Sequence, residues 1–354
     1  MTATTTTTTT LLAMGDPQAP FQTVRAVLDH HKLTQGDKLK PGARLLSIGD
    51  HYDWGGVNER QRAADDGDAL LSWLSGHAAE QVVLLAGNHD LARVGELINV
   101  DDAEFARLQQ LADRHYLGKK HPDDDAAFFN ACRFLPSTEM VARDLSTYRA
   151  SQQALVKQLL LDRRMRLAHA EGGLLFTHAG ITRKALVRLG LDDSSPPNEI
   201  ATALNAALDD AVDTCLRREV ALPLGLPGLH RPADGIGEGD GVLYHRPTFV
   251  DDDAWLEPRR FDPRRLPRGL WQVVGHVRDR RCVSALKAWS EPKAHVVGVV
   301  RHLISEGDKV VYRHGLPPPR ASVSPSAAVM IFIDGAMQEC PPAQYELLDV
   351  AKIV

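Results

Sequence analysis

The sequence RLLSIGDHYD, residues 44–53, joins a short apolar run to a group of polar and acidic side chains. The apolar part, Arg44 to Ile48, is continuous instead of alternating, which is typical of a strand covered on both faces. It ends at Gly49 and Asp50, and Asp53 follows three residues later. Because ligands of α/β sheets bind beyond the carboxyl ends of the strands, we expect Asp50 and Asp53 to face a functional site.

The same pattern recurs along the chain. Apolar runs that end in polar residues occupy residues 11–14, 82–86, 174–177 and 272–274. The segments 21–31 and 63–77, which separate the first three runs, carry apolar residues at helical spacing. Strand and helix in alternation indicate βαβ units, so the sequence predicts an α/β fold with a largely parallel sheet. Further helices are expected within 148–161 and 183–218, and further strands at 295–300, 309–312 and 329–333.

Side chains that bind metal ions stand at the ends of the predicted strands. They are Asp16, Asp50, Asn88, His178 and His276, with Gln18, Asp53 and His89 beside them. If the five strand ends share one edge of the sheet, these side chains come together. Oxygen and imidazole ligands without thiolate suit Mn²⁺, Fe or Zn²⁺, and a shared aspartate can hold two ions ~3.5–4 Å apart. Taken singly, each aspartate is also an ordinary turn residue after a strand.

These motifs resemble those of the calcineurin-like metallophosphoesterase superfamily and are most similar to its phosphoprotein-phosphatase branch and the bacterial relatives of that branch. They read G-D-x-Q, G-D-x-x-D-x-G, G-N-H-D, T-H-A-G and G-H, and span residues 16–276, about three quarters of the chain. The resemblance implies a sandwich of two mixed β-sheets flanked by helices. It also implies a single catalytic domain over residues 11–354, after a low-complexity segment at 1–10, with helical insertions near 102–169 and 183–218.

The resemblance further implies a role for each site residue. Asp16 would bind the first of two divalent metal ions and Asp50 would bridge both. The second ion would be bound by Asn88, His178 and His276. A hydroxide held between the two ions would then attack the phosphorus of a phosphomonoester. The metals expected are Mn²⁺, with Fe or Zn²⁺ as alternatives.

Two further residues would act on the substrate and not on the metals. His89 would face the leaving oxygen as a general acid or charge stabiliser, and Asp53 would orient His89, as a carboxylate fixes an imidazole elsewhere. The function implied is that of a metal-dependent phosphatase whose substrate is a phosphoprotein or a small phosphorylated metabolite.

The sequence departs from the family pattern at two positions. Gln18 stands where the family has a histidine ligand, and it could either bind the first metal weakly or hydrogen-bond a bound water. Trp54 stands where the phosphatase branch has an arginine that grips phosphate, and its indole cannot form that contact. Arg246 is the expected substitute, with Arg93 in reserve. Arg278, where other branches have a second histidine, favours the phosphatase branch.

The composition excludes several other classes of protein. The 354 residues are 44% hydrophobic with a net charge of −5, which argues against a dedicated nucleic-acid binder. The four cysteines, at 132, 215, 282 and 340, form no C-x-x-C pair, which favours reduced thiols. Neither a membrane span nor a secretory signal is recognisable, so we expect a cytoplasmic protein.

Two other functions fit the same residues. Relatives with this kind of metal site cleave dinucleoside polyphosphates, which makes such a hydrolase the nearest alternative. The other alternative is a catalytically weak or inactive module that still binds metal or phosphate. Gln18 and Trp54 are its only support.

Overall fold

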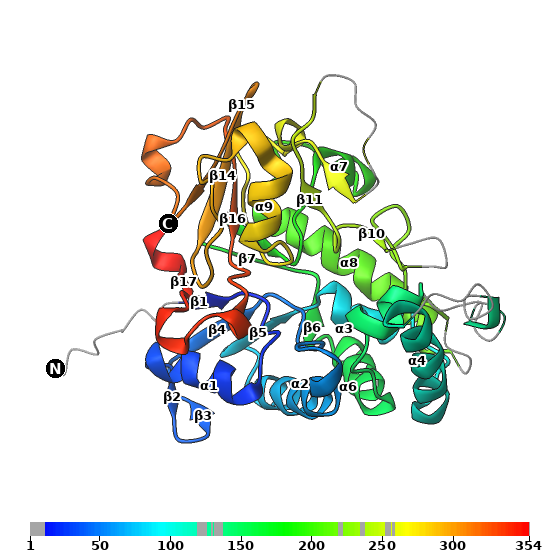
Figure 1. The fold of residues 1–354 in the computed structure, drawn as a ribbon. Coiled ribbons are helices and arrows are strands. Elements are labelled where there is room, and N and C mark those ends of the chain that lie inside the picture. Colours follow the sequence, from blue (N-terminus) through cyan, green and yellow to red (C-terminus); the bar gives the residue numbers. More distant parts are fainter. Residues whose placement is uncertain are drawn as a thin grey trace.

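The structure is a computed structural model with a mixed α/β fold (Figure 1), which confirms the predicted class. It describes residues 11–118, 126–128, 130, 137–218, 222–233, 238–251, 256 and 259–353. The low-complexity segment 1–10 lies outside these residues, and the division into a single domain stays a prediction.

The first large sheet contains the strands at the start of the chain. In spatial order its strands are β17 (Leu348–Asp349), β1 (Leu11–Met14), β4 (Arg44–Ser47), β5 (Val82–Leu85) and β6 (Met165–Arg166). All neighbouring pairs are parallel except β17 with β1. The helices α1 (Phe21–His30) and α2 (Arg60–Ser75) connect β1 to β4 and β4 to β5, so the predicted βαβ units are present.

The second large sheet contains the later strands. Its order is β15 (Lys309–His314), β14 (Arg301–Glu306), β16 (Ala328–Phe332), β13 (Trp271–Val274), β8 (Leu174–Thr177) and β7 (Ala168–Glu171). The central strands β16, β13 and β8 are parallel to one another, whereas β7, β14 and β15 pair in antiparallel fashion. The carboxyl ends of β8, β13 and β16 therefore lie at one edge of this sheet.

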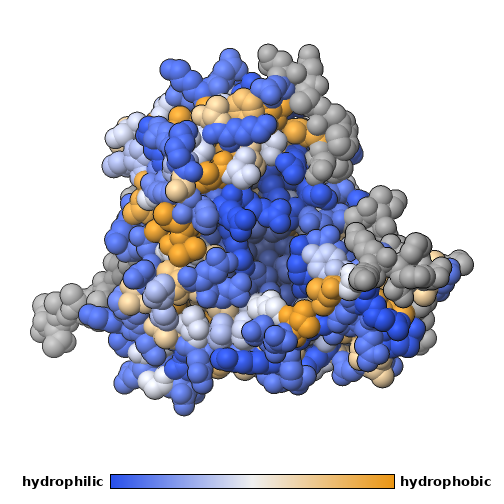
Figure 2. All heavy atoms as spheres, in the orientation of Figure 1, coloured by the Kyte–Doolittle hydropathy of each residue, from blue (hydrophilic) through white to orange (hydrophobic). Residues whose placement is uncertain are grey.

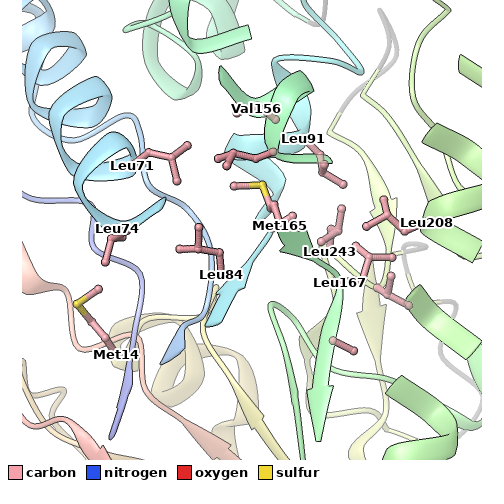
Figure 3. Close-up of a cluster of buried hydrophobic side chains, with 14 of the residues drawn as sticks. Met14, Leu71, Leu74, Leu84, Leu91, Val156, Met165, Leu167, Leu208 and Leu243 are labelled. Atoms are coloured by element: carbon pink, nitrogen blue, oxygen red, sulfur yellow. The ribbon is translucent and has the colours of Figure 1, made fainter. Parts of the chain in front are cut away.

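The two sheets share one hydrophobic core. Ala13, Leu46 and Leu85 of the first sheet belong to the same buried cluster as Phe176 and Val273 of the second. Because successive strand residues point to opposite faces, their neighbours in sequence pack on the outer faces. The outer core of the first sheet includes Met14, Leu84, Leu71, Leu74, Val156 and Met165 (Figure 3).

Helices cover the outer faces of both sheets. The helices α1, α2 and α6 (Ala150–Leu161) supply buried residues to the outer core of the first sheet, whereas α8 (Pro197–Cys215) packs against β7 and β8 of the second sheet. On the second sheet, Cys282 and Leu286 of α9 (Asp279–Leu286) pack with Val274 and Phe332. The continuous apolar character of the strands follows from this burial on both faces.

A helical region beside the first sheet has a small core of its own. It includes α4 (Asp102–Tyr116) and the π-helical turn Met140–Asp144. The helical block expected near 102–169 ends earlier, at Leu161, because β6 and the start of β7 follow. The block expected at 183–218 is two helices, α7 (Arg183–Arg188) and α8, separated by a segment that contains Gly190 and Pro196.

The remaining elements are short. They are α3 (Asn88–Ala92) and the strands β2 (Thr34–Gln35), β3 (Lys38–Leu39), β9 (His230–Arg231), β10 (Asp240–Gly241), β11 (Arg246–Pro247) and β12 (Arg260–Phe261). Single 3₁₀ turns occupy Val57–Glu59, Pro263–Arg265, Lys287–Trp289, Arg320–Ser322, Met337–Glu339, Pro342–Gln344 and Val350–Lys352.

Two sequence-based expectations are wrong. The apolar segment 295–300 is not a strand; β14 begins one residue later, at Arg301. Its N–H groups bond elsewhere: Val296 donates to Asp279, and Val300 donates to Glu346. The strand ends that carry the polar motifs also do not share one sheet edge, because β1, β4 and β5 lie in the first sheet and β8 and β13 in the second.

Within the part of the chain that the structure describes, no helix combines the length and the apolar character needed to cross a lipid bilayer. The cytoplasmic location stays a prediction.

Candidate metal centre

The carboxyl ends of strands from both sheets meet at one cleft. Asp16, Asp50 and Asn88 follow β1, β4 and β5, whereas His178, His276 and Asp334 follow β8, β13 and β16. All of these except the fully buried His178 line a cleft of about 310 Å³. A hydrophilic hollow is visible at the centre of the molecule in Figure 2. The structure therefore gathers the predicted strand-end residues, although from two sheets.

The backbone at these positions is strained. Asp50, Asp53 and His276 have φ values of 59°, 64° and 60°, in the left-handed region that residues other than glycine rarely adopt. Such conformations cost free energy and persist where the surrounding structure enforces them, which is common at functional sites. The turns after β4 and β13 thus place their side chains at an energetic cost.

Two glycines let the backbone approach the carboxylates. A Cβ atom on Gly87 would collide with the Asp50 carboxylate, and a Cβ atom on Gly275 would collide with the Asp16 carboxylate. Glycine is therefore required at both positions, because any side chain would fill the space that the carboxylate occupies.

Three side chains form a compact group with the donor types of a metal site. One atom each of Asp50, His178 and His276 lies within 4.8 Å of the others. The Nε2 atom of His178 is 3.4 Å from Oδ2 of Asp50 and 3.0 Å from Oδ1 of Asn88. Its Nδ1 atom is 3.1 Å from the carbonyl oxygen of Ile48, which fixes the orientation of the ring. All four predicted ligands of the second metal are thus neighbours.

The charges in this group favour a cation. Burial would raise the pKa of Asp50, but His178 and His89 outweigh it and hold the pKa below the usual range. Burial together with the Arg246 guanidinium holds the pKa of His276 well below its ordinary value, so that ring is neutral. The Nε2 atom of His276 is buried without a hydrogen-bond partner among the described residues. A neutral imidazole with an unsatisfied buried nitrogen beside an ionised carboxylate fits a metal ion.

Asp16 lies on the other side of the group. Its carboxylate accepts the backbone N–H of His276, with N–O distances of 2.9 and 3.1 Å. Burial and the neighbouring charge of Asp334 hold the pKa of Asp16 well above the usual value of a carboxyl. Because two buried carboxyl groups this close disfavour each other's ionisation, a bound cation would relieve the conflict.

Asp334 is a candidate ligand that the sequence reasoning missed. It is 3% exposed and lines the cleft. The available signal was its position after the apolar run 328–333, the same pattern that identified Asp16 and Asp50.

The predicted pair of His89 and Asp53 is in contact. Nδ1 of His89 lies 2.9 Å from Oδ2 of Asp53. The same carboxylate accepts bonds from Arg93 at 2.6 Å and from the hydroxyl of Thr147 at 2.6 Å. Burial alone would lower the pKa of His89, but the charges of Asp50 and Asp53 raise it to about 9. His89 is therefore held in one orientation and protonated at neutral pH.

Asp90, the last residue of the G-N-H-D motif, supports the turn that carries Asp50. Its buried carboxylate accepts the backbone N–H groups of Gly87, Asp50 and His51 at 2.8, 2.8 and 3.1 Å. It also contacts Nδ1 of His51 at 3.0 Å. These bonds link the ends of β4 and β5, which explains how the strained turn is stabilised.

Gln18 and Trp54 occupy different surroundings. Gln18 lines the cleft, but its Nε2 donates to the carbonyl of Tyr52 at 3.2 Å and its Oε1 is 3.5 Å from a nitrogen of Arg278. Trp54 is 7% exposed and is not among the residues that line the cleft, and the guanidinium of Arg62 lies 5.5 Å from its ring. Whether Gln18 binds a metal stays a prediction.

Arg93 is unsuited to grip a substrate, so its reserve role is wrong. Its side chain is fully buried, and it bonds Asp53 and Gln152 and lies over the ring of Tyr52. Arg246 does line the cleft and pairs with Glu238 at 2.7 Å. Three further arginines also line it, at positions 143, 278 and 281, and none of them was predicted from the sequence as a contact for phosphate. Arg143 and Arg281 belong to no motif, and Arg278 was considered only for its spacing after the G-H motif.

Comparisons with known proteins identify no family. No protein-family model matches the chain, and no curated protein matches it. Among solved structures it is similar to the cold-active protein-tyrosine phosphatase of the psychrophile Shewanella sp., with 16% identity over 60% of this chain and 52% of that chain and a TM-score of 0.32. Another structure of a cold-active protein tyrosine phosphatase gives 15% identity, coverages of 76% and 64%, and a TM-score of 0.34. The chain spans about half the length of the first, and TM-scores of this size establish neither a shared fold nor a shared activity.

Proposed function

We propose that this protein is a metal-dependent phosphatase of the metallophosphoesterase type. The observation that carries the proposal is the convergence of Asp50, His178 and His276, with an unsatisfied buried Nε2 on His276, at a cleft whose rim carries arginines. Two mixed sheets that share a core and hold the site at their carboxyl ends support it. Its substrate class is a phosphorylated protein or metabolite.

The residues fit two divalent ions, for which Mn²⁺ is the first candidate. Asp16, with Asp334 beside it, would hold the first, Asp50 would contact both, and Asn88, His178 and His276 would hold the second. When bound, such ions supply an activated water at neutral pH and neutralise charge that develops on the phosphoryl oxygens. The strained turns at Asp50 and His276 hold these two side chains in place before a metal ion binds, so little rearrangement of the protein is needed.

His89 supplies the proton for the leaving oxygen. Its Nδ1 is taken by Asp53, so the opposite nitrogen, Nε2, is the one that can reach substrate; it lies 3.9 Å from Oδ2 of Asp50. A protonated imidazole beside the metal ligands can donate to the departing alkoxide, and a general acid requires this position and protonation state. Arg246 is the cation best placed to bind the phosphoryl group, because it borders the cleft near His276.

Removal of metal tests the proposal directly. Hydrolysis of p-nitrophenyl phosphate should fall to the background rate after treatment with EDTA and should return when Mn²⁺ is added. Hydrolysis that survives complete metal removal would contradict the proposal. Stable metal binding without hydrolysis of this ester, of phosphopeptides or of diadenosine tetraphosphate would instead favour the inactive binding module.

Replacing Asp53 by asparagine should move the alkaline limb of the pH–rate profile. His89 acts as an acid only while it is protonated, so activity should be lost as the pH rises through its pKa, which the contact with Asp53 helps to raise. Bound cations offset the charge of Asp50, which leaves Asp53 as the charge that keeps His89 protonated. Without it the pKa of His89 should fall towards about 6.5, so the alkaline limb should move down by about 1 pH unit or more.

The profile of kcat against pH, measured with saturating Mn²⁺, checks this expectation. Asp37→Asn is the matched control, because the Asp37 side chain is fully exposed and should leave the profile unchanged. An asparagine at position 53 tolerates the left-handed backbone. An alkaline limb at the same pH in both variants would remove Asp53 from its role.

A further inference from the structure

A second cavity adjoins the metal-binding cleft. It measures about 610 Å³ and shares Arg246, Arg278 and Arg281 with the cleft. Its walls come from α9, the strand β11 and the segments 295–297 and 335–339. We call this cavity the basic pocket. Because three residues border both spaces, the cleft and the basic pocket are neighbours, which is the arrangement that a ligand with two binding groups would need.

Cations without an ion-pair partner among the described residues line the basic pocket, and Glu238 and Asp144 offset part of the charge of Arg281. Arg280, Arg281 and Lys287 line it, and none of them has an ion-pair partner within the described ranges 11–118, 137–218, 238–251 and 259–353 or the shorter stretches between them. Burial is the main reason that the pKa of Arg281 lies below its usual value, and the neighbouring positive charge of Arg246 is the second. Clustered cations of this kind attract anions.

The acidic groups of the pocket are already engaged. The buried carboxylate of Asp279 accepts the N–H of Val296 at 2.7 Å and the hydroxyl of Tyr312 at 2.5 Å, and lies 2.9 Å from Nε2 of His314. Glu339 pairs with Arg278 at 3.0 Å. Among the residues that the structure describes, neither of these acids forms an ion pair with Arg280, Arg281 or Lys287.

The pocket also offers apolar surface. The ring of Phe249 is partly exposed there and has the ammonium group of Lys287 5.7 Å from its centre, and Val296 is 39% exposed. A volume of about 610 Å³ lies within the range of small-molecule pockets, roughly 300–1,000 Å³. The combination suits the carbon skeleton of a small molecule that carries an anionic end.

We propose that the basic pocket binds a second phosphoryl group of the substrate, on the part that is released when the first is hydrolysed. The inference rests on the proposed function, because it takes the cleft as the place of the first phosphoryl group. It narrows the substrate class to small molecules with two phosphoryl groups separated by a linker. A phosphopeptide would instead need an extended surface beyond the cleft and this one pocket.

Two matched series of ligands test this inference. One series is alkanediol bisphosphates of increasing chain length, and the other is alkyl monophosphates of the same lengths. Both are measured as competitive inhibitors and by calorimetric titration of the Mn²⁺-loaded protein. At the chain length that spans the two sites, the bisphosphate should bind about tenfold or more tightly than its monophosphate, since the second group adds a charge-assisted contact. In Arg280→Glu and in Lys287→Glu this advantage should fall below about twofold.

Lys309→Glu is the control, because it makes the same charge reversal on an exposed lysine that lines none of the cavities described above. It should keep the advantage. A bisphosphate advantage that is absent at every length, or that survives in both pocket variants, would overturn the inference. So would a preference for acidic phosphopeptides over bisphosphates that disappears in the pocket variants. Calorimetry needs no turnover, so the inference can fail or hold independently of the proposed hydrolysis.

Discussion

Asp50→Asn is expected to lower phosphatase activity on the order of 10³-fold or more and to reduce the bound metal content. One carboxylate oxygen of Asp50 accepts the N–H of His89 at 2.9 Å, and the other faces His178 at 3.4 Å. An amide retains the first contact, since its oxygen also accepts, but it has no negative charge to hold two cations. The loss should therefore come from metal binding and not from unfolding.

The structure supplies the reason to expect a folded variant. Asparagine adopts left-handed backbone more readily than most residues, so the φ of 59° at this position is tolerated. Metal content by mass spectrometry and turnover of p-nitrophenyl phosphate are the measurements, with Asp37→Asn as the exposed control. Unchanged turnover with full metal content would exclude Asp50 from the bridging role.

His89→Ala is expected to retain both metal ions and to lose about 10²–10⁴-fold in kcat, the usual contribution of a general acid. The imidazole contacts Asp53 through Nδ1, and its Nε2 is 3.9 Å from Asp50, beyond hydrogen-bonding distance. Removing the imidazole leaves the Asp53 carboxylate hydrogen-bonded to Arg93 and Thr147, so Asp53 should keep its position. The defect should thus appear in the chemical step.

The choice of substrate sharpens this prediction. An aryl ester with a good leaving group needs little protonation, so the variant should lose less activity on p-nitrophenyl phosphate than on an alkyl phosphate. His30→Ala, at the exposed end of α1, is the control. If metal content falls in step with rate, His89 is a ligand and the role assigned to it is wrong.

The motif residues were predictable because their signal is local. A continuous apolar run followed by glycine and a polar residue identifies both a buried strand and its carboxyl end, and this holds for Asp16, Asp50, Asn88 and His276. At His178 the polar residue follows the run and the glycine, Gly180, comes two residues later. The helices α1 and α2 were also predictable, because apolar residues recur at helical spacing along both segments. In contrast, the run 295–300 has strand composition, but Asp279 and Glu346 bind its N–H groups, and neither contact is local.

The sequence alone thus established the α/β class, the strand-end residues and their chemical types. The spacing of apolar residues and the residue types in turns depend only on a few neighbouring positions, so both can be recognised locally. Only the folded molecule revealed that two sheets contribute to one cleft, that Asp334 stands beside Asp16, and that Arg93 serves Asp53 and not a substrate. Those features depend on partners distant in the chain, such as Thr147 with Asp53, 94 residues apart. Long-range packing also decides whether a charged side chain is paired inside the protein or free to bind a substrate, and no local sequence pattern encodes this.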